Sequence, residues 1–252
     1  GITGSSDLIT ADVVASHLEI QGTLDKALLL SDQASTFNGL SVIALDDNGQ
    51  IDRDWLYPKG AKFLDNASDM VLQKDGKLLI VGTTADQPPG ATEASVNYRV
   101  IRLDADGKPD VSFGNSGVVI LDPHSGLDDR LPKITLRKDG KILIAGSATK
   151  GPQWGLPSDY SDFSIIQLNS DGSLDDSFGD HGKALFDVGK STADRSVIIA
   201  LQDDKILIAG DTNDQPSGLA GTTSNIVILR LDANGALDLG FGTNGKTLLS
   251  SP

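Results

Sequence analysis

Two stretches of the sequence share a pattern of carboxylate, amide and proline residues, and an aromatic-rich stretch lies between them. The paired stretches read DQPPG at residues 86–90 and DQPSG at residues 214–218, and GPQWGLPSDY occupies residues 151–160. A glycan site needs an aromatic ring on which a sugar stacks and planar groups that hydrogen-bond its hydroxyls. We therefore predict that these stretches bind a ligand. The predicted binding residues are Asp86, Gln87, Trp154, Asp159, Tyr160, Asp214 and Gln215.

The same residues allow two other interpretations. In the first, Trp154 and Tyr160 simply pack the loop that contains them. In the second, two of the carboxylates of Asp86, Asp159 and Asp214 act as acid and base in glycoside cleavage, where their separation decides the stereochemistry. No motif in the sequence identifies a reaction, so the catalytic residues are not assigned and catalysis remains an alternative to binding.

A second set of Asp residues lies in a repeated turn motif. LDADGKPDVSFG at residues 103–114 recurs as LNSDGSLDDSFG at 168–179 and as LDANGALDLGFG at 231–242. The spacing of Asp104, Asp106 and Asp110 is similar to that of a calcium loop, but the late bidentate Glu of such a loop is missing. We favour structural turns, in which Asp and Asn accept backbone N–H groups and the third Asp caps the turn before Ser-Phe-Gly. We accordingly predict no metal and no cofactor.

Two further residue types recur once per repeat. An aromatic residue closes each turn motif, and we interpret it as packing between neighbouring units. A lysine follows a second motif, typified by QKDGKLLIVG at residues 73–82, and we expect it to flank a hairpin turn and to bury only its stem. The aromatic residues are Trp55, Phe113, Phe178 and Phe241, and the lysines are Lys77, Lys141 and Lys205.

The elements that must position these residues form four copies of one unit of about 60 residues. In the second copy we predict strands at 69–74, 77–84, 97–104 and 117–121, joined by an Asp-Gly hairpin turn and by the Asp-rich turn. The long connections 85–95, 149–162 and 213–224 then lie together at the opposite end of the sheets from both turn motifs. Binding residues are often placed on such loops of a rigid scaffold, and we name this end the long-loop face.

The predicted fold is all-β: a β-propeller built from four four-stranded antiparallel blades. The ring is either closed with four blades or half of an eight-bladed ring formed by a homodimer. We expect residues 1–11 to be a linker and 12–252 to be a single domain. Its repeats are expected at about 12–66, 67–130, 131–190 and 191–252.

The turn motif, with QKDGKLLIVG upstream of it, resembles the delta-60 repeat family of bacterial proteins. The resemblance covers nearly the whole chain, although the first unit has Trp55 in place of Phe and lacks the following glycine. It implies a propeller-like β fold in large, often exported bacterial proteins, and it implies no catalytic residues.

Composition excludes several classes of partner. The net charge is −14, from 21 basic and 35 acidic residues, so we expect neither nucleic acid nor an anionic membrane surface to bind. The sequence contains no cysteine, which excludes disulfides and thiolate chemistry. No apolar run is long enough for a membrane helix, so we expect no membrane insertion.

Together these features predict a non-catalytic binding or scaffold domain of a secreted or cell-surface bacterial protein, with a glycan or peptide ligand on the long-loop face. The alternatives are a glycan-active enzyme that uses loop carboxylates, and a purely structural assembly module.

Overall fold

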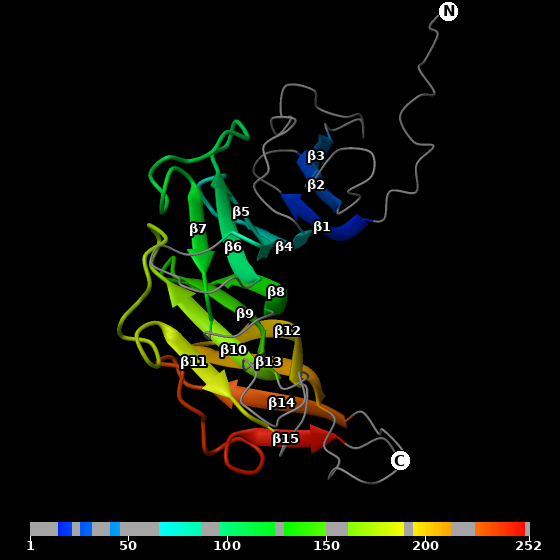
Figure 1. Ribbon diagram of the computed structural model, residues 1–252, viewed down its shortest axis with the longest axis vertical. Helices are drawn as coiled ribbons and strands as arrows, with labels where there is room; N and C mark the ends of the chain where they lie inside the picture. Colours follow the sequence, from blue (N-terminus) through cyan, green and yellow to red (C-terminus); the bar gives the residue numbers. More distant parts are fainter. Residues whose placement is uncertain are drawn as a thin grey trace, which may run out of the picture.

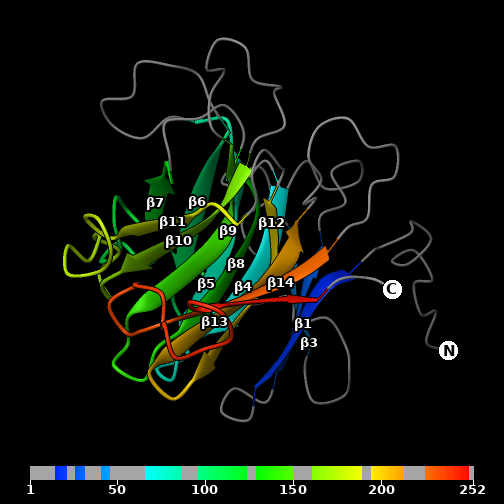
Figure 2. The same cartoon turned by 90° about the horizontal axis from the view of Figure 1, so that it is seen from below.

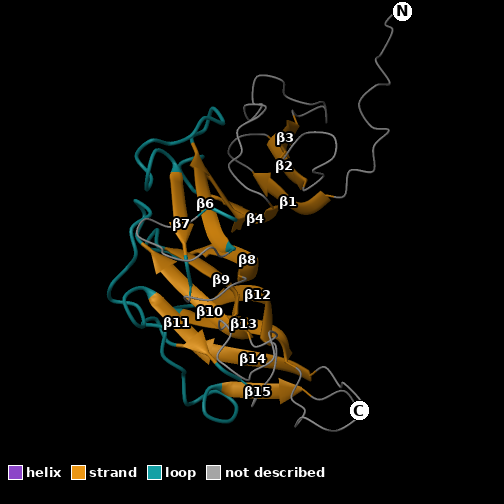
Figure 3. Ribbon diagram, viewed as in Figure 1, coloured by secondary structure: helices purple, strands orange, loops and turns teal. Residues whose placement is uncertain are grey.

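The computed structural model describes residues 15–21, 26–31, 41–45, 66–86, 96–123, 129–149, 161–188, 194–212 and 225–249. These residues form strands and turns, and they contain no helix (Figures 1 and 3). The described part therefore also has no helix that could cross a membrane. The all-β prediction is confirmed for this part of the chain.

The strands form four antiparallel sheets in which sequence neighbours pair in order. The first sheet has three described strands: β1 (Ala15–Gln21), β2 (Lys26–Ser31) and β3 (Ser41–Leu45). The second has β4 (Asn66–Leu72), β5 (Leu78–Thr84), β6 (Asn97–Leu103) and β7 (Val118–Leu121). The third has β8 (Asp129–Leu136), β9 (Ile142–Thr149), β10 (Ser161–Leu168) and β11 (Lys183–Phe186). The fourth has β12 (Asp194–Gln202), β13 (Lys205–Thr212), β14 (Asn225–Leu231) and β15 (Lys246–Leu249).

The sheets stack face to face in chain order (Figures 1 and 2). The first strand of each sheet contacts the first strand of the next, so that β1, β4, β8 and β12 run through the stack. Strands β7 and β11 lie on the opposite side (Figure 1). Figure 1 also places the first and fourth sheets at opposite ends, with the other two between them.

The strand predictions for the second unit match the observed strands to within three residues at each end. The Asp75-Gly76 turn forms as expected, with Gly76 at a φ of 84° and a hydrogen bond of 2.8 Å from Gln73 N to Lys77 O. Strand β5 is buried along nearly its whole length, as its continuous apolar run indicates. Strand β6 is buried at every residue, including Arg99 and Arg102.

A β-bulge interrupts the first strand of every sheet. In β4 the bulge lies between Ala67 and Asp69, and Asp69 Oδ2 accepts a hydrogen bond of 3.0 Å from Ile134 N in the next sheet. Ser68 Oγ donates to Pro132 O at 2.5 Å across the same interface. Bulges re-aim backbone and side-chain groups, and here they bond neighbouring sheets to one another.

The core is divided between the sheet interfaces. One cluster joins the second and third sheets, with Tyr98 and Val100 against Ile144 and Ile166. A second cluster joins the third and fourth sheets, where Phe163 packs among apolar residues of β13 and β14. Each inner sheet therefore buries both faces against its neighbours, and each end sheet has one neighbour in the stack.

Candidate functional site

All seven predicted binding residues belong to the long connections of the long-loop face. Of these, only Asp86 falls within the described residues. Asp86 lies two residues after the end of β5, at the end of the sheet opposite both turn motifs. The other six, Gln87, Trp154, Asp159, Tyr160, Asp214 and Gln215, lie outside the described ranges, so their prediction stays a prediction.

Asp86 is held at the start of its loop by three neighbours. Its carboxylate pairs with Arg99, with 2.5 Å between Oδ2 and the guanidinium Nη2. Its backbone N–H donates to Thr84 Oγ1 at 3.1 Å, and its carbonyl accepts from Asn97 Nδ2 at 3.0 Å. The carboxylate is still 62% exposed, whereas the arginine is 10% exposed. This arrangement suits a carboxylate that orients the loop or accepts ligand hydroxyls better than one that donates a proton.

Buried polar residues also occupy the strand ends next to the long connections of the second and fourth sheets. Thr84 pairs in register with Asn97, and Thr212 pairs with Asn225 at the matching position. All four are at most 7% exposed. The third sheet has Ala148 opposite a buried Asp162 instead. The strand ends next to the long connections thus each carry at least one buried polar residue in the second, third and fourth sheets.

The turn end of the sheets gathers the charged residues of the repeat. The third Asp of each turn motif accepts from backbone N–H two residues further on, as the capping prediction required; for example, Ser112 N lies 3.0 Å from Asp110 Oδ1. Its other oxygen faces the recurring lysine. The distances from Nζ to Oδ2 are 2.8 Å for Lys77–Asp110, 2.6 Å for Lys141–Asp175 and 3.2 Å for Lys205–Asp238.

The lysine side chains stay 31–42% exposed, which is compatible with the prediction that they bury only their stems, but each ammonium group also has an aspartate partner that was not predicted. A second partner joins each pair from the third strand. Arg102 Nε lies 2.9 Å from Asp110, Arg230 Nε lies 2.9 Å from Asp238, and Gln167 Nε2 takes the same place 2.5 Å from Asp175. Sequence reasoning missed this partner. Its signal was the constant spacing of eight residues between the third-strand Arg or Gln and the capping Asp.

These contacts keep the capping carboxylates ionised. A hydrogen bond from Lys141 lowers the pKa of Asp175 well below its usual range and outweighs the opposing effect of burial. Burial raises the pKa of Asp110, but hydrogen bonds from Lys77 and Ser112 outweigh it and again leave the pKa low. The pKa of Asp238 is lowered by its bond with Lys205. Ionised acids that are bound in this way stabilise the fold and are poor proton donors.

Two of the four recurring aromatic residues, Phe113 and Phe178, pack between adjacent sheets as predicted, whereas Trp55 lies outside the described residues. Phe113 and Phe178 are fully buried. Each ring lies against the turn glycine of the next sheet, where an added Cβ would come within 2.8 Å of it: Gly172 for Phe113 and Gly235 for Phe178. The residue after each Phe then donates its N–H to the next turn, from Gly114 N to Asp171 O and from Gly179 N to Asn234 O, both at 2.8 Å. We call this arrangement the Phe–Gly lock.

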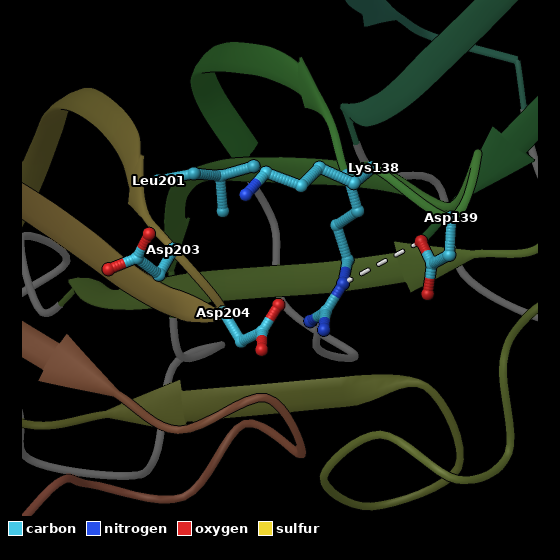
Figure 4. Close-up of a pocket in the computed structure, with 6 residues that line it drawn as sticks. Lys138, Asp139, Leu201, Asp203 and Asp204 are labelled. Carbon is cyan, nitrogen blue, oxygen red and sulfur yellow. Dashed lines mark ion pairs between the residues drawn. The ribbon is translucent and has the colours of Figure 1, made fainter.

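A small hollow lies at the turn end between the third and fourth sheets (Figure 4). Its lining is mostly charged: Arg137, Lys138, Asp139, Leu201, Asp203 and Asp204. Arg137 spans it to reach Ala233 O at 3.0 Å. The volume of about 90 Å³ is well below the roughly 300–1,000 Å³ of small-molecule sites. Within the described residues, no group of three or more His, Cys, Asp or Glu side chains is arranged to hold a metal ion.

Tyr98 offers a test of how specific the sheet contacts are. Its hydroxyl donates to Ser147 O at 2.9 Å and lies 3.0 Å from Ser164 Oγ, both in the next sheet and both buried. Phe163 occupies the matching position of the third sheet, so a phenyl ring fits there. Tyr98→Phe should therefore lower the free energy of unfolding by about 1–2 kcal/mol through lost hydrogen bonds alone, measured by urea denaturation. An unchanged midpoint would show that the hydroxyl contributes nothing.

Three segments of the chain match the family model described as "Domain of unknown function (DUF5122) beta-propeller": residues 73–113, 137–178 and 201–241. Each segment runs from the turn after the first strand to the recurring Phe. The chain therefore carries β-propeller-type repeats, and the matched segments are the ones that form the Lys–Asp pairs and the Phe–Gly lock. No curated protein matches the sequence.

Among solved structures, a GH43_12 retrieved from a capybara gut metagenome is similar, with a TM-score of 0.47 and 13% identity over 85% of this chain and 38% of that one. A xylan beta-1,4-xylosidase from Bacillus Halodurans C-125 has a TM-score of 0.44 and 13% identity over 93% of this chain and 41% of that one. The chain thus spans less than half the length of either protein.

Proposed function

We propose that the chain is a non-catalytic scaffold and ligand-binding domain, with a glycan or peptide ligand on the long-loop face. One observation carries the proposal. In the second to fourth sheets the recurring Lys and Asp residues pair with one another, and Phe113 and Phe178 pack on the sheet that follows. The recurring residues therefore build the scaffold, and the sequences that differ between repeats lie in the long loops.

The loop residues have the chemistry of a sugar site. Trp154 supplies a stacking surface, and Asp86 is an exposed carboxylate fixed in place by Arg99. A fixed, exposed acceptor binds hydroxyl groups with little loss of side-chain entropy. The paired DQPPG and DQPSG stretches add amide groups from alternate repeats. These features support binding of a neutral, hydroxyl-rich ligand by a domain whose net charge is −14.

The finer predictions belong to the same proposal. The motif resemblance favours delta-60 repeats of an exported bacterial protein, and we propose a cell-surface or extracellular location on that basis. The stacked sheets favour blades of a ring. Whether four sheets close on themselves or two chains complete a larger ring is addressed by the experiment of the next subsection.

A glycan array, with a peptide array in parallel, tests the ligand. We expect binding that weakens about tenfold or more in Trp154→Ala, since loss of one stacking contact of about 1.4 kcal/mol corresponds to that factor. The thermal unfolding midpoint should not change, because the binding loops lie outside the locked sheets. No signal on either array, or equal binding by wild type and Trp154→Ala, would contradict the proposed site.

Release of reducing sugar from any glycan that binds separates binding from catalysis. We expect no release. Release that is lost in Asp159→Asn or Asp214→Asn, with binding retained, would instead establish the enzymatic alternative. Asp86→Asn serves as the comparison, because its ion pair with Arg99 makes it a positioning residue.

A further inference from the structure

The last sheet presents apolar residues on the face that the second and third sheets bury against the sheet that follows them. Tyr98 in β6 and Phe163 in β10 are fully buried against the following sheet. The residue at the same register position of β14 is Ile226, which is 52% exposed. Leu121 of β7 is 5% exposed, whereas the matching Leu249 of β15 is 49% exposed. The fourth sheet thus keeps the apolar contact residues without a sheet to contact.

The Phe–Gly lock is also incomplete at the fourth sheet. Phe113 and Phe178 are fully buried, but Phe241 is only half-buried. The guanidinium of Arg230 still stacks 4.6 Å from the centre of the Phe241 ring, so this half of the lock is preformed. Within the described residues, no carbonyl accepts from Gly242 N as Asp171 and Asn234 do for the two preceding sheets. We call this surface, with Ile226, Ile228, Phe241 and Leu249, the tail face.

Exposure of the tail face is a property of its position at the end of the stack. Terminal units of repeat proteins usually carry a polar outer face that ends the stack. This sheet retains aliphatic side chains at the register positions that bury in earlier sheets. Leu239 is not part of the face: it is 70% exposed, but the matching Val111 is 77% exposed within the stack. The tail face is therefore shaped to receive another sheet of the same kind.

The first sheet carries the complementary sequence. Where a sheet docks on its predecessor, four apolar positions of its second and third strands are buried; in the third sheet they are Ile142, Ile144, Ile166 and Leu168. By strand register, the same positions of the first sheet hold Ala27, Leu29, Ile43 and Leu45. In the sequence, Leu45 also begins the turn motif LDDNG, which supplies the glycine that a lock requires.

The chain therefore has Phe241 on the open face of its fourth sheet and, in its sequence, a turn glycine after the strands of its first sheet. Figure 1 shows the first and fourth sheets at opposite ends of the stack, so the first sheet of the same chain does not cover Phe241. We propose that the tail face binds the first sheet of a second copy of this chain. Two copies joined head to tail at both ends would form a closed ring of eight sheets, within the usual propeller range of about 4–8 blades.

This inference does not depend on a ligand at the long loops, and sedimentation analysis of the chain alone tests it. We expect a particle of twice the chain mass of 26.3 kDa at high protein concentration. Ile226→Lys places a charge in the contact and should raise the dissociation constant by about a hundredfold or more. Val111→Lys is the matched control and should leave the constant unchanged, because that side chain is exposed between sheets that are already packed.

A mixing experiment tests the head-to-tail direction. Ile43→Lys alters the first sheet and leaves the tail face intact, and Ile226→Lys does the reverse. Each variant alone should be monomeric, and an equimolar mixture should form dimers through the one intact contact. Circular dichroism confirms that both variants stay folded. A wild-type monomer at every concentration, an assembly that Ile226→Lys leaves unchanged, or a mixture that stays monomeric would each overturn the proposal.

Discussion

Gly172→Ala should lower the free energy of unfolding by about 2–5 kcal/mol. Two costs add. Gly172 has a φ of 90°, where an L side chain is strained by about 1–2 kcal/mol. The added Cβ would also lie 2.8 Å from the Phe113 ring and from Val119 Cγ2, and relief of such overpacking costs about 1–3 kcal/mol. Chemical denaturation, with the midpoint and slope fitted together, measures the loss.

Gly140→Ala is the matched control, because it introduces the same backbone strain as Gly172→Ala but brings no Cβ against an aromatic ring. Gly140 has a φ of 85°, and nothing lies within 4 Å of a Cβ placed there. We expect its cost to remain at about 1–2 kcal/mol. The difference between the two variants isolates the Phe–Gly lock. Equal losses would show that the turn glycines serve local conformation only and that the ring contact is incidental.

The strands were predictable because their signals are local. Alternation, continuous apolar runs and Asp-Gly turns each act within about ten residues, and β5 and β6 were placed from them with small errors. The sequence of a single strand cannot show whether a neighbouring sheet buries that strand. Arg99 and Arg102 are charged residues of β6, yet both are buried, and each pairs with an aspartate of the same repeat.

The capping role of the turn motif was predicted, but the contacts of its third Asp with residues distant in sequence were not. Asp110 was expected to cap the turn, and it does, but its second oxygen bonds residues from two other strands. Such pairs join positions 33 and 8 residues away, and only the sheet register brings them together. A repeat helps here, since polar residues that recur at constant spacing within one chain indicate a shared contact.

The long-loop site could be predicted only in part, for a physical reason. Loop conformation depends on side chains of the loop itself and on the ends of several strands, so no short periodic signal specifies it. Asp86 illustrates the point: its role follows from Arg99 and Asn97, which lie across the strand pair and not near it in sequence. The aromatic and amide content of the loops indicates a ligand class, and the scaffold determines only where that class would be presented.

The Phe–Gly locks and the Lys–Asp pairs stabilise the same contacts between adjacent sheets. These contacts explain how a chain without disulfides maintains its stack of sheets. Each Lys–Asp pair anchors the turn that carries the next Phe, so the electrostatic contact orients the apolar one. Arg102 joins the two directly: it bonds Asp110, lies 4.5 Å over the Phe113 ring and donates to Ser170 O in the next sheet. The junctions should therefore weaken when the carboxylates are neutralised.

Asp175→Asn should lower the free energy of unfolding at neutral pH by about 2–4 kcal/mol, since a buried charged hydrogen-bond network loses its acceptor charge. Asp175 is 6% exposed and bonds Lys141, Gln167 and Ser177. Asp176→Asn is the control: that side chain is 84% exposed, so its substitution should change stability by no more than about 0.5 kcal/mol. Urea denaturation at neutral pH compares the three proteins.

The pH dependence gives a second, independent readout of the same pair. The hydrogen bond from Lys141 lowers the pKa of Asp175 in the folded state below the value of about 3.9 in an unfolded chain. The unfolded state therefore binds the proton first as the pH falls, so the stabilisation is present above about pH 4 and is lost as the pH drops through the folded pKa. Wild type should lose stability faster than Asp175→Asn below pH 4, and the gap between them should narrow. Parallel curves down to the lowest pH at which both fold would mean that the charge of Asp175 does not stabilise the junction.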